Sequence, residues 1–245
     1  MANWSDPQPN GAAFAASAGV RGAAYDAGLR SYMLSVYNYM TSAVLLSGIV
    51  ALGFALSGAA AQVFLGGGLL KWIITFAPLG FVFAMSFGQA RMSQGTLQLM
   101  FWGFAVAMGL SLSTIFLVYS EVAIAQAFFT AAAGFAGLSL WGYTTKRDLS
   151  AMGTFLLMGL IGLIVASLLN VFLHSGPLAL VISLAGLGIF AGLTAYDTQK
   201  TKSLYAAVAG TPYEGRVAVM AALNLYLDFI NMFLFILRLF GGNRN

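Results

Sequence analysis

The sequence predicts an all-α membrane protein built as a bundle of seven transmembrane helices. Only 7% of the 245 residues are charged, whereas soluble domains average about 25%. Hydrophobic residues make up 60% of the chain, and the mean hydropathy is +0.87. A water-soluble globule of this size could not cover its surface with so few charges. The composition therefore excludes a soluble enzyme, a nucleic-acid-binding protein and a disordered chain.

Seven apolar stretches follow one another along the chain, and each is about the 20 residues that a helix needs to cross ~30 Å of hydrocarbon. Lipid offers the backbone no hydrogen-bond partner, so such stretches must be helical. The predicted spans are residues 34–57, 72–90, 97–119, 122–144, 151–173, 177–196 and 217–240.

The first 30 residues differ from the rest of the chain. They are rich in Ala, Gly, Ser, Asn and Pro and contain no continuous apolar run, so they do not resemble a secretory signal peptide. We interpret residues 1–30 as a mobile tail. Residues 31–245 are then one seven-helix transmembrane domain, because this length suits a single bundle.

Basic residues are divided unevenly between the two sides of the predicted bundle. The tail and alternate loops place eight of them on one side: Arg21, Arg30, Arg91, Lys146, Arg147, Lys200, Lys202 and Arg216. The opposite side has three: Lys71, Arg238 and Arg244. The positive-inside rule therefore predicts a cytoplasmic N-terminus.

Few residue types are available for chemistry. The chain has no cysteine and one histidine, His174, which excludes disulfides, a cysteine nucleophile and a metal site built from several histidines. We expect neither an enzyme nor a resident cofactor.

Asp228 is the one charge near the middle of a predicted span. A charge at that depth costs about 2.5–3.5 kcal/mol on insertion scales, so it needs compensation. Asn224, Asp228 and Asn231 lie at i, i+4 and i+7 and share one helix face. This spacing predicts a polar stripe turned towards the bundle interior. The opposite face, which we expect to contact lipid, holds Tyr226, Phe229, Ile230 and Phe233.

Asp197 and Arg91 are the other charges of interest. Asp197 closes the predicted sixth span, and Asp228 lies 11 positions, about 16 Å, into the seventh. The two acids meet only if the sixth helix is cut short in a cavity or the seventh begins below the membrane plane. Arg91 stands at the same end as Asp197, where it either pairs with the acids or anchors the helix at the interface.

Two segments resemble the transmembrane Bax inhibitor motif family: AYDTQK at residues 195–200 and NLYLDFINMFLFILRLFG at residues 224–241. The resemblance implies six helices around a central seventh. It also implies a pH-sensitive calcium leak in a bacterial inner membrane, in which Asp197 and Asp228 share a proton and Arg91 acts as a latch. Some bacterial relatives instead associate with a membrane-bound ATP-dependent protease.

The residues are compatible with the leak on separate physical grounds. Two nearby carboxylates in a low dielectric cannot both ionise cheaply, so such a pair keeps a proton and acts as a switch. We expect the protonated pair to clamp the last two helices together. Loss of the proton would leave a cation site of Asp197, Asp228, Asn224 and Asn231, whose oxygen atoms suit calcium. Two acids are too few for a tight cage, which favours passage over storage.

Other functions remain possible on the sequence alone. Intramembrane aspartyl proteases also use two membrane aspartates, but their Gly-x-Gly-Asp motif is absent here, where Leu225, Tyr226 and Leu227 precede Asp228. A secondary transporter would often show repeated halves, and no repeat is evident. A regulator that binds a membrane protease is the main alternative, and the 1–30 tail fits it.

Overall fold

The computed structural model describes the backbone of residues 10–241 and the side-chain surroundings of residues 23–241. The helices of this part are α1 (Asn10–Leu56), α2 (Ala59–Leu65), α3 (Leu69–Gly88), α4 (Gln94–Leu112), α5 (Ile115–Val118), α6 (Glu121–Thr144), α7 (Ser150–Leu173), α8 (Gly176–Val208) and α9 (Glu214–Phe240). Seven segments of the described chain are long and apolar enough to cross a membrane, one of which contains both α4 and α5, and only α2 lies outside them. The all-α, seven-span prediction is therefore confirmed.

The predicted spans and the helices differ mainly at their ends. α1 begins at Asn10, so the expected boundary at residue 30 is not a break in the helix; residues 1–9 lie outside the described residues. α8 continues to Val208 and α9 already begins at Glu214. The third span is interrupted near Ser113, where the side-chain hydroxyl donates to the Leu110 carbonyl and so competes with the backbone for a helical acceptor.

Local sequence explains where several helices begin. Ser93, Ser120 and Ser175 each accept a hydrogen bond from the backbone N–H three residues later, and so cap α4, α6 and α8. His174 ends α7 in the left-handed conformation, with φ of 48°. α7 and α8 consequently form a tight hairpin.

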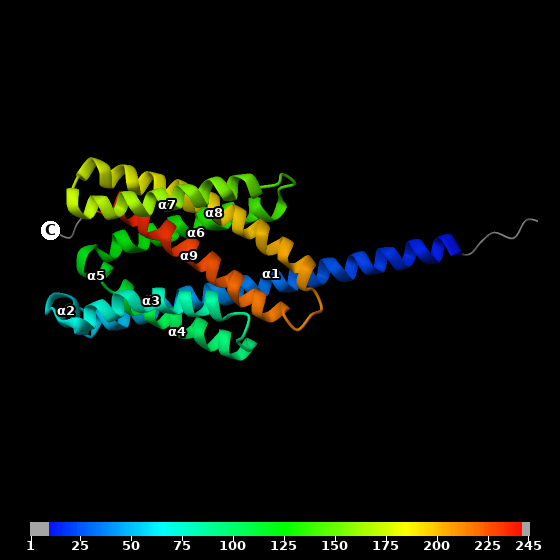
Figure 1. The fold of residues 1–245 in the computed structure, drawn as a ribbon, viewed down its shortest axis with the longest axis horizontal. Helices are drawn as coiled ribbons and strands as arrows, with labels where there is room; N and C mark the ends of the chain where they lie inside the picture. Colours follow the sequence, from blue (N-terminus) through cyan, green and yellow to red (C-terminus); the bar gives the residue numbers. More distant parts are fainter. Residues whose placement is uncertain (1–9, 242–245) are drawn as a thin grey trace, which may run out of the picture.

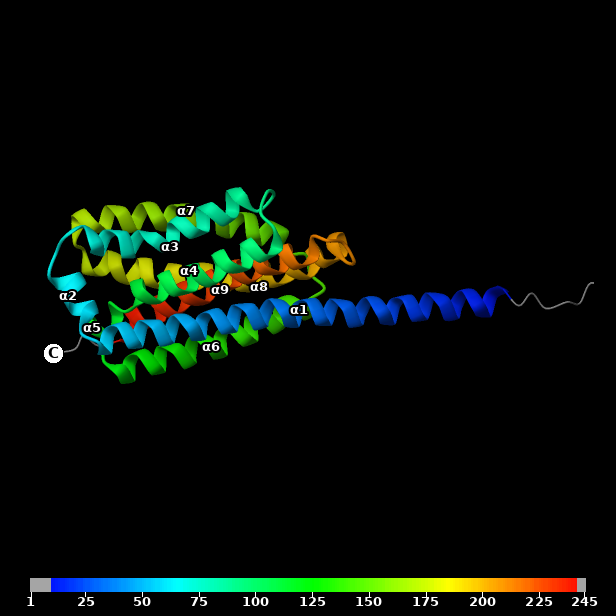
Figure 2. The same ribbon diagram turned by 90° about the horizontal axis from the view of Figure 1, so that it is seen from below.

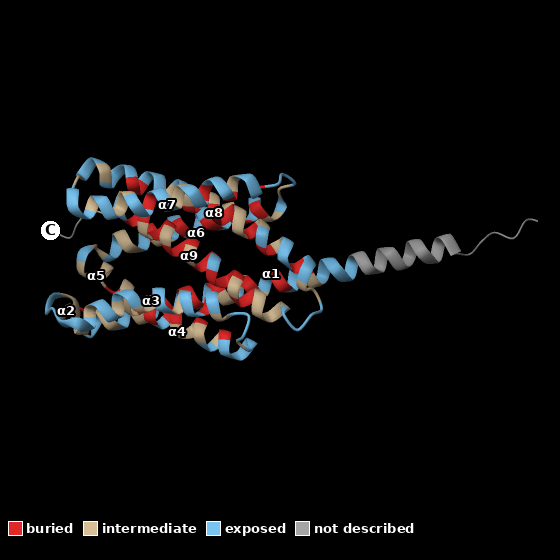
Figure 3. Cartoon of the chain, viewed as in Figure 1, coloured by how far each residue is buried: buried red, intermediate tan, exposed pale blue. Residues whose placement is uncertain are grey.

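α9 runs obliquely through the bundle, with α1 and α6 on one side and α3 and α7 on the opposite side (Figures 1 and 2). It packs against α8, α1, α6 and α4. In its most apolar stretch 72% of the residues are buried, against 39% in α8 and less in the other spans. Figure 3 shows this burial along the length of α9.

The expected orientation of α9 is wrong. The four residues assigned to the lipid face (Tyr226, Phe229, Ile230 and Phe233) are all buried. Of the predicted polar stripe only Asp228 is buried, whereas Asn224 is exposed and Asn231 is half-buried. The reason is that lipid is as apolar as a helix bundle interior, so an apolar face does not show which of the two it contacts.

Close helix contacts support α8 around the position of Asp197. A Cβ atom on Gly142 of α6 would meet the Ala195 carbonyl oxygen, and one on Gly153 of α7 would meet the Tyr196 ring. Gly142 lets α6 approach the backbone of α8, and Gly153 leaves room on α7 for the Tyr196 ring. The segment that carries Asp197 is thereby held between two neighbouring helices.

Candidate functional site

The carboxyl groups of Asp197 on α8 and Asp228 on α9 lie within hydrogen-bonding reach of each other. Asp197 stands 11 residues before the end of α8 and Asp228 stands 14 residues after the start of α9, or about 16 and 21 Å of rise. Both helices extend beyond the predicted spans before residues 209–213 connect them. The two acids therefore lie at a similar depth, because the seventh helix begins below the point where its apolar stretch starts.

The surroundings of Asp228 favour a proton shared with Asp197. Its side chain is only 4% exposed, and its Oδ2 atom has no donor within reach among the described residues. Carboxylates are acceptors only, so a hydrogen bond between two of them needs a proton on one. The arrangement thus suits one proton held between Asp197 and Asp228.

Neighbouring polar groups on α8 are occupied elsewhere. The Thr198 hydroxyl donates to Ser139 of α6 at 3.3 Å, and the Thr194 hydroxyl donates to the Phe190 carbonyl at 2.8 Å. The cation that acts on Asp197 is Lys200, whose Nζ atom also lies 5.8 Å from the centre of the Tyr196 ring. The acid pair is therefore bordered by one cation and by hydroxyl groups that already have partners.

The two predicted asparagine ligands flank Asp228 on α9 without touching it. The Asn231 Nδ2 atom donates to the Leu227 carbonyl at 2.8 Å, which leaves its Oδ1 atom free to accept. Asn224 is exposed. In the described part of the chain neither amide bonds to Asp197 or Asp228, and no group of three or more His, Asp or Glu side chains is placed to hold a metal ion.

Arg91 is not brought to the acid pair. It lies in the turn after α3, its side chain is exposed, and its backbone N–H donates to the Gly88 carbonyl. At this end of the bundle, Arg216 of α9 is the arginine whose side chain makes specific contacts. Its guanidinium donates to the Met92 carbonyl at 3.1 Å and lies 4.5 Å from the centre of the Tyr213 ring.

Sequence reasoning missed two groups that orient α9. One is Arg216, for which the only signal was a basic residue beside Gly215 at the helix start. The other is the Tyr226 hydroxyl, which lies 2.7 Å from that of Ser47. Ser47 in turn donates to the Ala105 carbonyl at 2.7 Å. The available signal is a tyrosine two residues before a membrane aspartate, but the helical spacing predicts that its face contacts lipid.

Outside the spans, Asp148 is the acid with a distinct electrostatic environment. It is fully exposed, and hydrogen bonds from the Ser150 side chain and backbone lower the pKa of its carboxyl below the ordinary 3.8. The Ser150 N–H lies 2.9 Å from its Oδ1 atom. Asp148 thus supports the start of α7.

Fold and site together define a multi-pass α-helical membrane protein with an acid pair between its last two helices. The family described as inhibitor of apoptosis-promoting Bax1 matches residues 29–245, and the chain belongs to this family. It is 45% identical over 221 residues to the uncharacterized protein RP147 of Rickettsia prowazekii, with 90% of this chain and 93% of the relative covered. It is 40% identical over 220 residues to the inner membrane protein YbhL of Escherichia coli K12, with 89% and 94% covered. That match and the seven apolar helices support a multi-pass location in a bacterial inner membrane.

Proposed function

We propose that the chain provides a pH-sensitive leak pathway for calcium or a similar cation, and that the Asp197–Asp228 pair is its gate. The observation that carries this proposal is the mutual approach of two carboxyl groups on consecutive helices, of which Asp228 is 4% exposed and has no donor for its Oδ2 atom among the described residues. The chain acts without catalysis and without a resident cofactor, and calcium is its cargo.

The gate follows from the electrostatics of the pair. With one proton bound, the hydrogen bond between the acids links α8 to α9. When the proton leaves, two anions face each other in a low dielectric and repel. The link between the helices then loosens. The leak therefore opens as the pH rises and closes as it falls.

The oxygen atoms that the open gate would present suit a hard cation. Calcium prefers carboxylate and amide oxygens in sets of six to eight. Asp197 and Asp228 supply carboxylates, and the free Oδ1 atom of Asn231 lies one turn further along α9, with Asn224 one turn before. So small a protein set leaves most ligands to water, which favours rapid passage over tight binding.

The latch role of Arg91 needs movement of the α3–α4 turn. Arg91 is exposed there, and no ion pair joins it to an acid in the described residues. The uneven charge distribution supports a cytoplasmic N-terminus, so this turn, the basic loop that contains Asp148 and the α8–α9 connection face the cytoplasm. A latch at Arg91 then acts on the cytoplasmic mouth.

Calcium flux into liposomes that contain the purified full-length chain tests the proposal across mildly acidic to mildly basic pH. The wild-type leak should rise with pH. Asp228→Asn should abolish this dependence, because an amide keeps a hydrogen bond to Asp197 at every pH. Asp148→Asn is the matched control on an exposed loop and should keep it. Unaltered pH dependence in Asp228→Asn would remove the pair from the gate, and no wild-type flux would reject the leak.

The arrangement of α1 favours a second candidate, a regulator that binds a membrane-bound ATP-dependent protease. The start of α1 projects beyond the other helices (Figure 1), and residues before 29 lie outside the matched family region. Deletion of residues 1–22 distinguishes the two functions. Co-purification of the protease should be lost, whereas calcium flux in liposomes should persist.

A further inference from the structure

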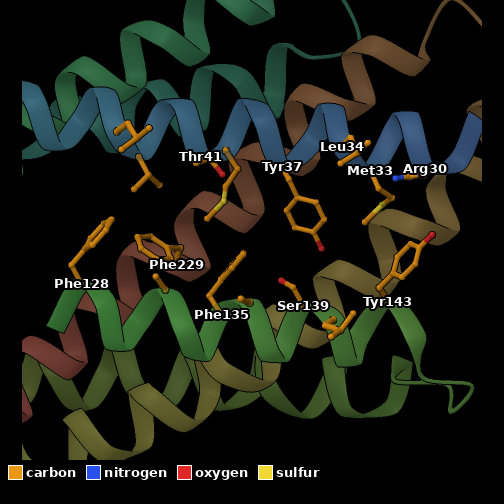
Figure 4. A pocket seen from close by; sticks show the side chains of 16 residues that line it. Arg30, Met33, Leu34, Tyr37, Thr41, Phe128, Phe135, Ser139, Tyr143 and Phe229 are labelled. Carbon is orange, nitrogen blue, oxygen red and sulfur yellow. The ribbon is translucent and has the colours of Figure 1, made fainter. Parts of the chain in front are cut away.

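A groove of about 840 Å³ lies between α1 and α6 (Figure 4). The two helices pack on α8 and α9 rather than on each other, and Phe229 of α9 contributes to the groove. Most of its lining is apolar, including Met33, Val44 and Phe128. Because both helices are membrane spans, this groove opens towards hydrocarbon, and its occupant must be apolar where it lies inside.

The groove is longer than one leaflet of hydrocarbon is thick. It extends along α1 from Arg30 to Leu45, or about 22 Å of helix rise. One leaflet contributes about half of the ~30 Å hydrocarbon core. Figure 4 places Arg30 and Tyr143 at one end and Phe128 at the other. A single acyl chain that starts at the Arg30 end and runs to the middle of the bilayer can therefore lie inside the groove.

A polar cavity continues the groove at this end. Tyr143 lines both, and the cavity of about 580 Å³ is also lined by Lys146, Arg147 and Lys202. The Lys202 Nζ atom donates to the Tyr143 carbonyl at 2.9 Å and lies 4.8 Å from the centre of its ring. An ammonium has three N–H donors, so Lys202 keeps others for a ligand.

The charges around this end favour an anion. Four cations (Arg30, Lys146, Arg147 and Lys202) stand against two acids (Asp26 and Asp148). The charged groups of Arg30, Lys146 and Arg147 form no ion pair or hydrogen bond with another described residue. Basic pockets at the ends of membrane helices are typical sites for acidic lipid headgroups.

We infer that this groove and cavity bind one anionic phospholipid. An acyl chain lies between α1 and α6, and the phosphate is held by the cations around Tyr143. A partner helix or a second copy of the chain would fill the apolar groove, whereas an anionic lipid also places a negative charge beside Arg30, Lys146 and Arg147, which have no charged partner among the described residues. The inference does not rest on the proposed cation pathway.

Native mass spectrometry of the purified full-length chain tests this inference with phosphatidylglycerol and phosphatidylcholine of identical acyl chains. We expect one phosphatidylglycerol per chain to be retained preferentially. Arg30→Gln and Arg147→Gln should each reduce that preference about fivefold, the effect of one cation near an acidic lipid. Lys71→Gln removes a cation at the start of α3, outside the site, and should leave the preference unchanged.

A pair of groove variants separates a bound lipid from lipid that merely surrounds the protein. Ala136→Trp fills the groove and should abolish selective retention, whereas Ala133→Trp adds the same ring on α6 outside it. Equal retention of the two lipids, or selective retention by Ala136→Trp, would overturn the inference. So would displacement by inorganic phosphate, which would indicate a soluble anion. A dimer that Ala136→Trp disrupts would identify a second copy as the occupant.

Discussion

The hydroxyl oxygens of Tyr226 and Ser47 lie 2.7 Å apart, and this hydrogen bond joins α9 to α1 inside the bundle. Ser47 donates its own proton to the Ala105 carbonyl, so Tyr226 must be the donor to Ser47. Two bonds thus connect α1, α4 and α9. Tyr226 precedes Asp228 by two residues, and its side chain is fully buried. We therefore expect this hydrogen bond to help fix the rotation of α9 about its axis.

Removal of the Tyr226 hydroxyl should destabilise the bundle modestly. Hydrogen bonds between membrane helices contribute about 0.6 kcal/mol on average and up to about 1.7, so Tyr226→Phe should lower the free energy of unfolding by about 1 kcal/mol. Ser47→Ala should cost more, because it also leaves the buried Tyr226 hydroxyl unpaired. Tyr37→Phe is the control, since its hydroxyl has no hydrogen-bond partner in the described residues. If Tyr226→Phe and the wild type have equal free energies of unfolding in detergent, packing alone orients α9.

Substitution at Gly142 should force α6 away from α8. A Cβ atom there would clash with the Ala195 carbonyl oxygen, which is backbone and cannot rotate aside. Overpacking of this kind costs about 1–3 kcal/mol, so Gly142→Ala should lower the thermal stability. Gly137→Ala on the same helix adds its Cβ atom to open space and should be neutral or stabilising. Similar losses of thermal stability in both variants would mean that the close approach of α6 to α8 does not determine the effect of Gly142→Ala.

The number and order of the spans could be predicted because hydropathy and length respond to the bilayer directly. The ends of α8 and α9 could not. After Asp197 the sequence of α8 turns polar, which hydropathy interprets as a loop, yet the helix continues to Val208. Contacts far apart in the sequence stabilise it: the Tyr205 ring lies 5.3 Å from that of Tyr25 and 5.2 Å from that of Tyr32.

The acid pair was predictable as two residues but not as a contact. Asp228 stood out because a charge inside an apolar stretch needs a partner. Its partner at Asp197 depended on how far two helices extend past their apolar segments, which is a tertiary property. Arg91 illustrates the converse. Its position in the sequence suggested a role beside the acids, but the turn after α3 leaves its side chain exposed.

Protonation of Asp148 should affect the start of α7 but not the pH dependence of the calcium flux. Hydrogen bonds from Ser150 lower the pKa of this carboxyl below 3.8, so its stabilisation of the α7 start is present above that value and is lost as the pH falls through the lowered pKa. The protection of the Ser150 amide against hydrogen exchange should therefore decrease only in acid. Asp148→Asn should remove that pH dependence of the protection. A shift of the flux midpoint near neutral pH in Asp148→Asn would contradict this separation.

Substitutions at Arg216 and Arg91 should distinguish a residue that attaches the start of α9 from a residue that acts as the latch. Arg216→Met keeps the aliphatic stem but removes the bond to the Met92 carbonyl and the contact with the Tyr213 ring. Because Arg216 is half-buried, we expect this variant to lower the free energy of unfolding by about 1–2 kcal/mol, with faster amide exchange over residues 213–217.

Arg91→Met removes an exposed cation and should change the free energy of unfolding by less than about 0.5 kcal/mol. If Arg91 is a latch, this variant should nevertheless raise the calcium leak at mildly acidic pH, where the acid pair alone must then keep the pathway closed. A normal leak in Arg91→Met together with a raised leak in Arg216→Met would transfer the latch to Arg216.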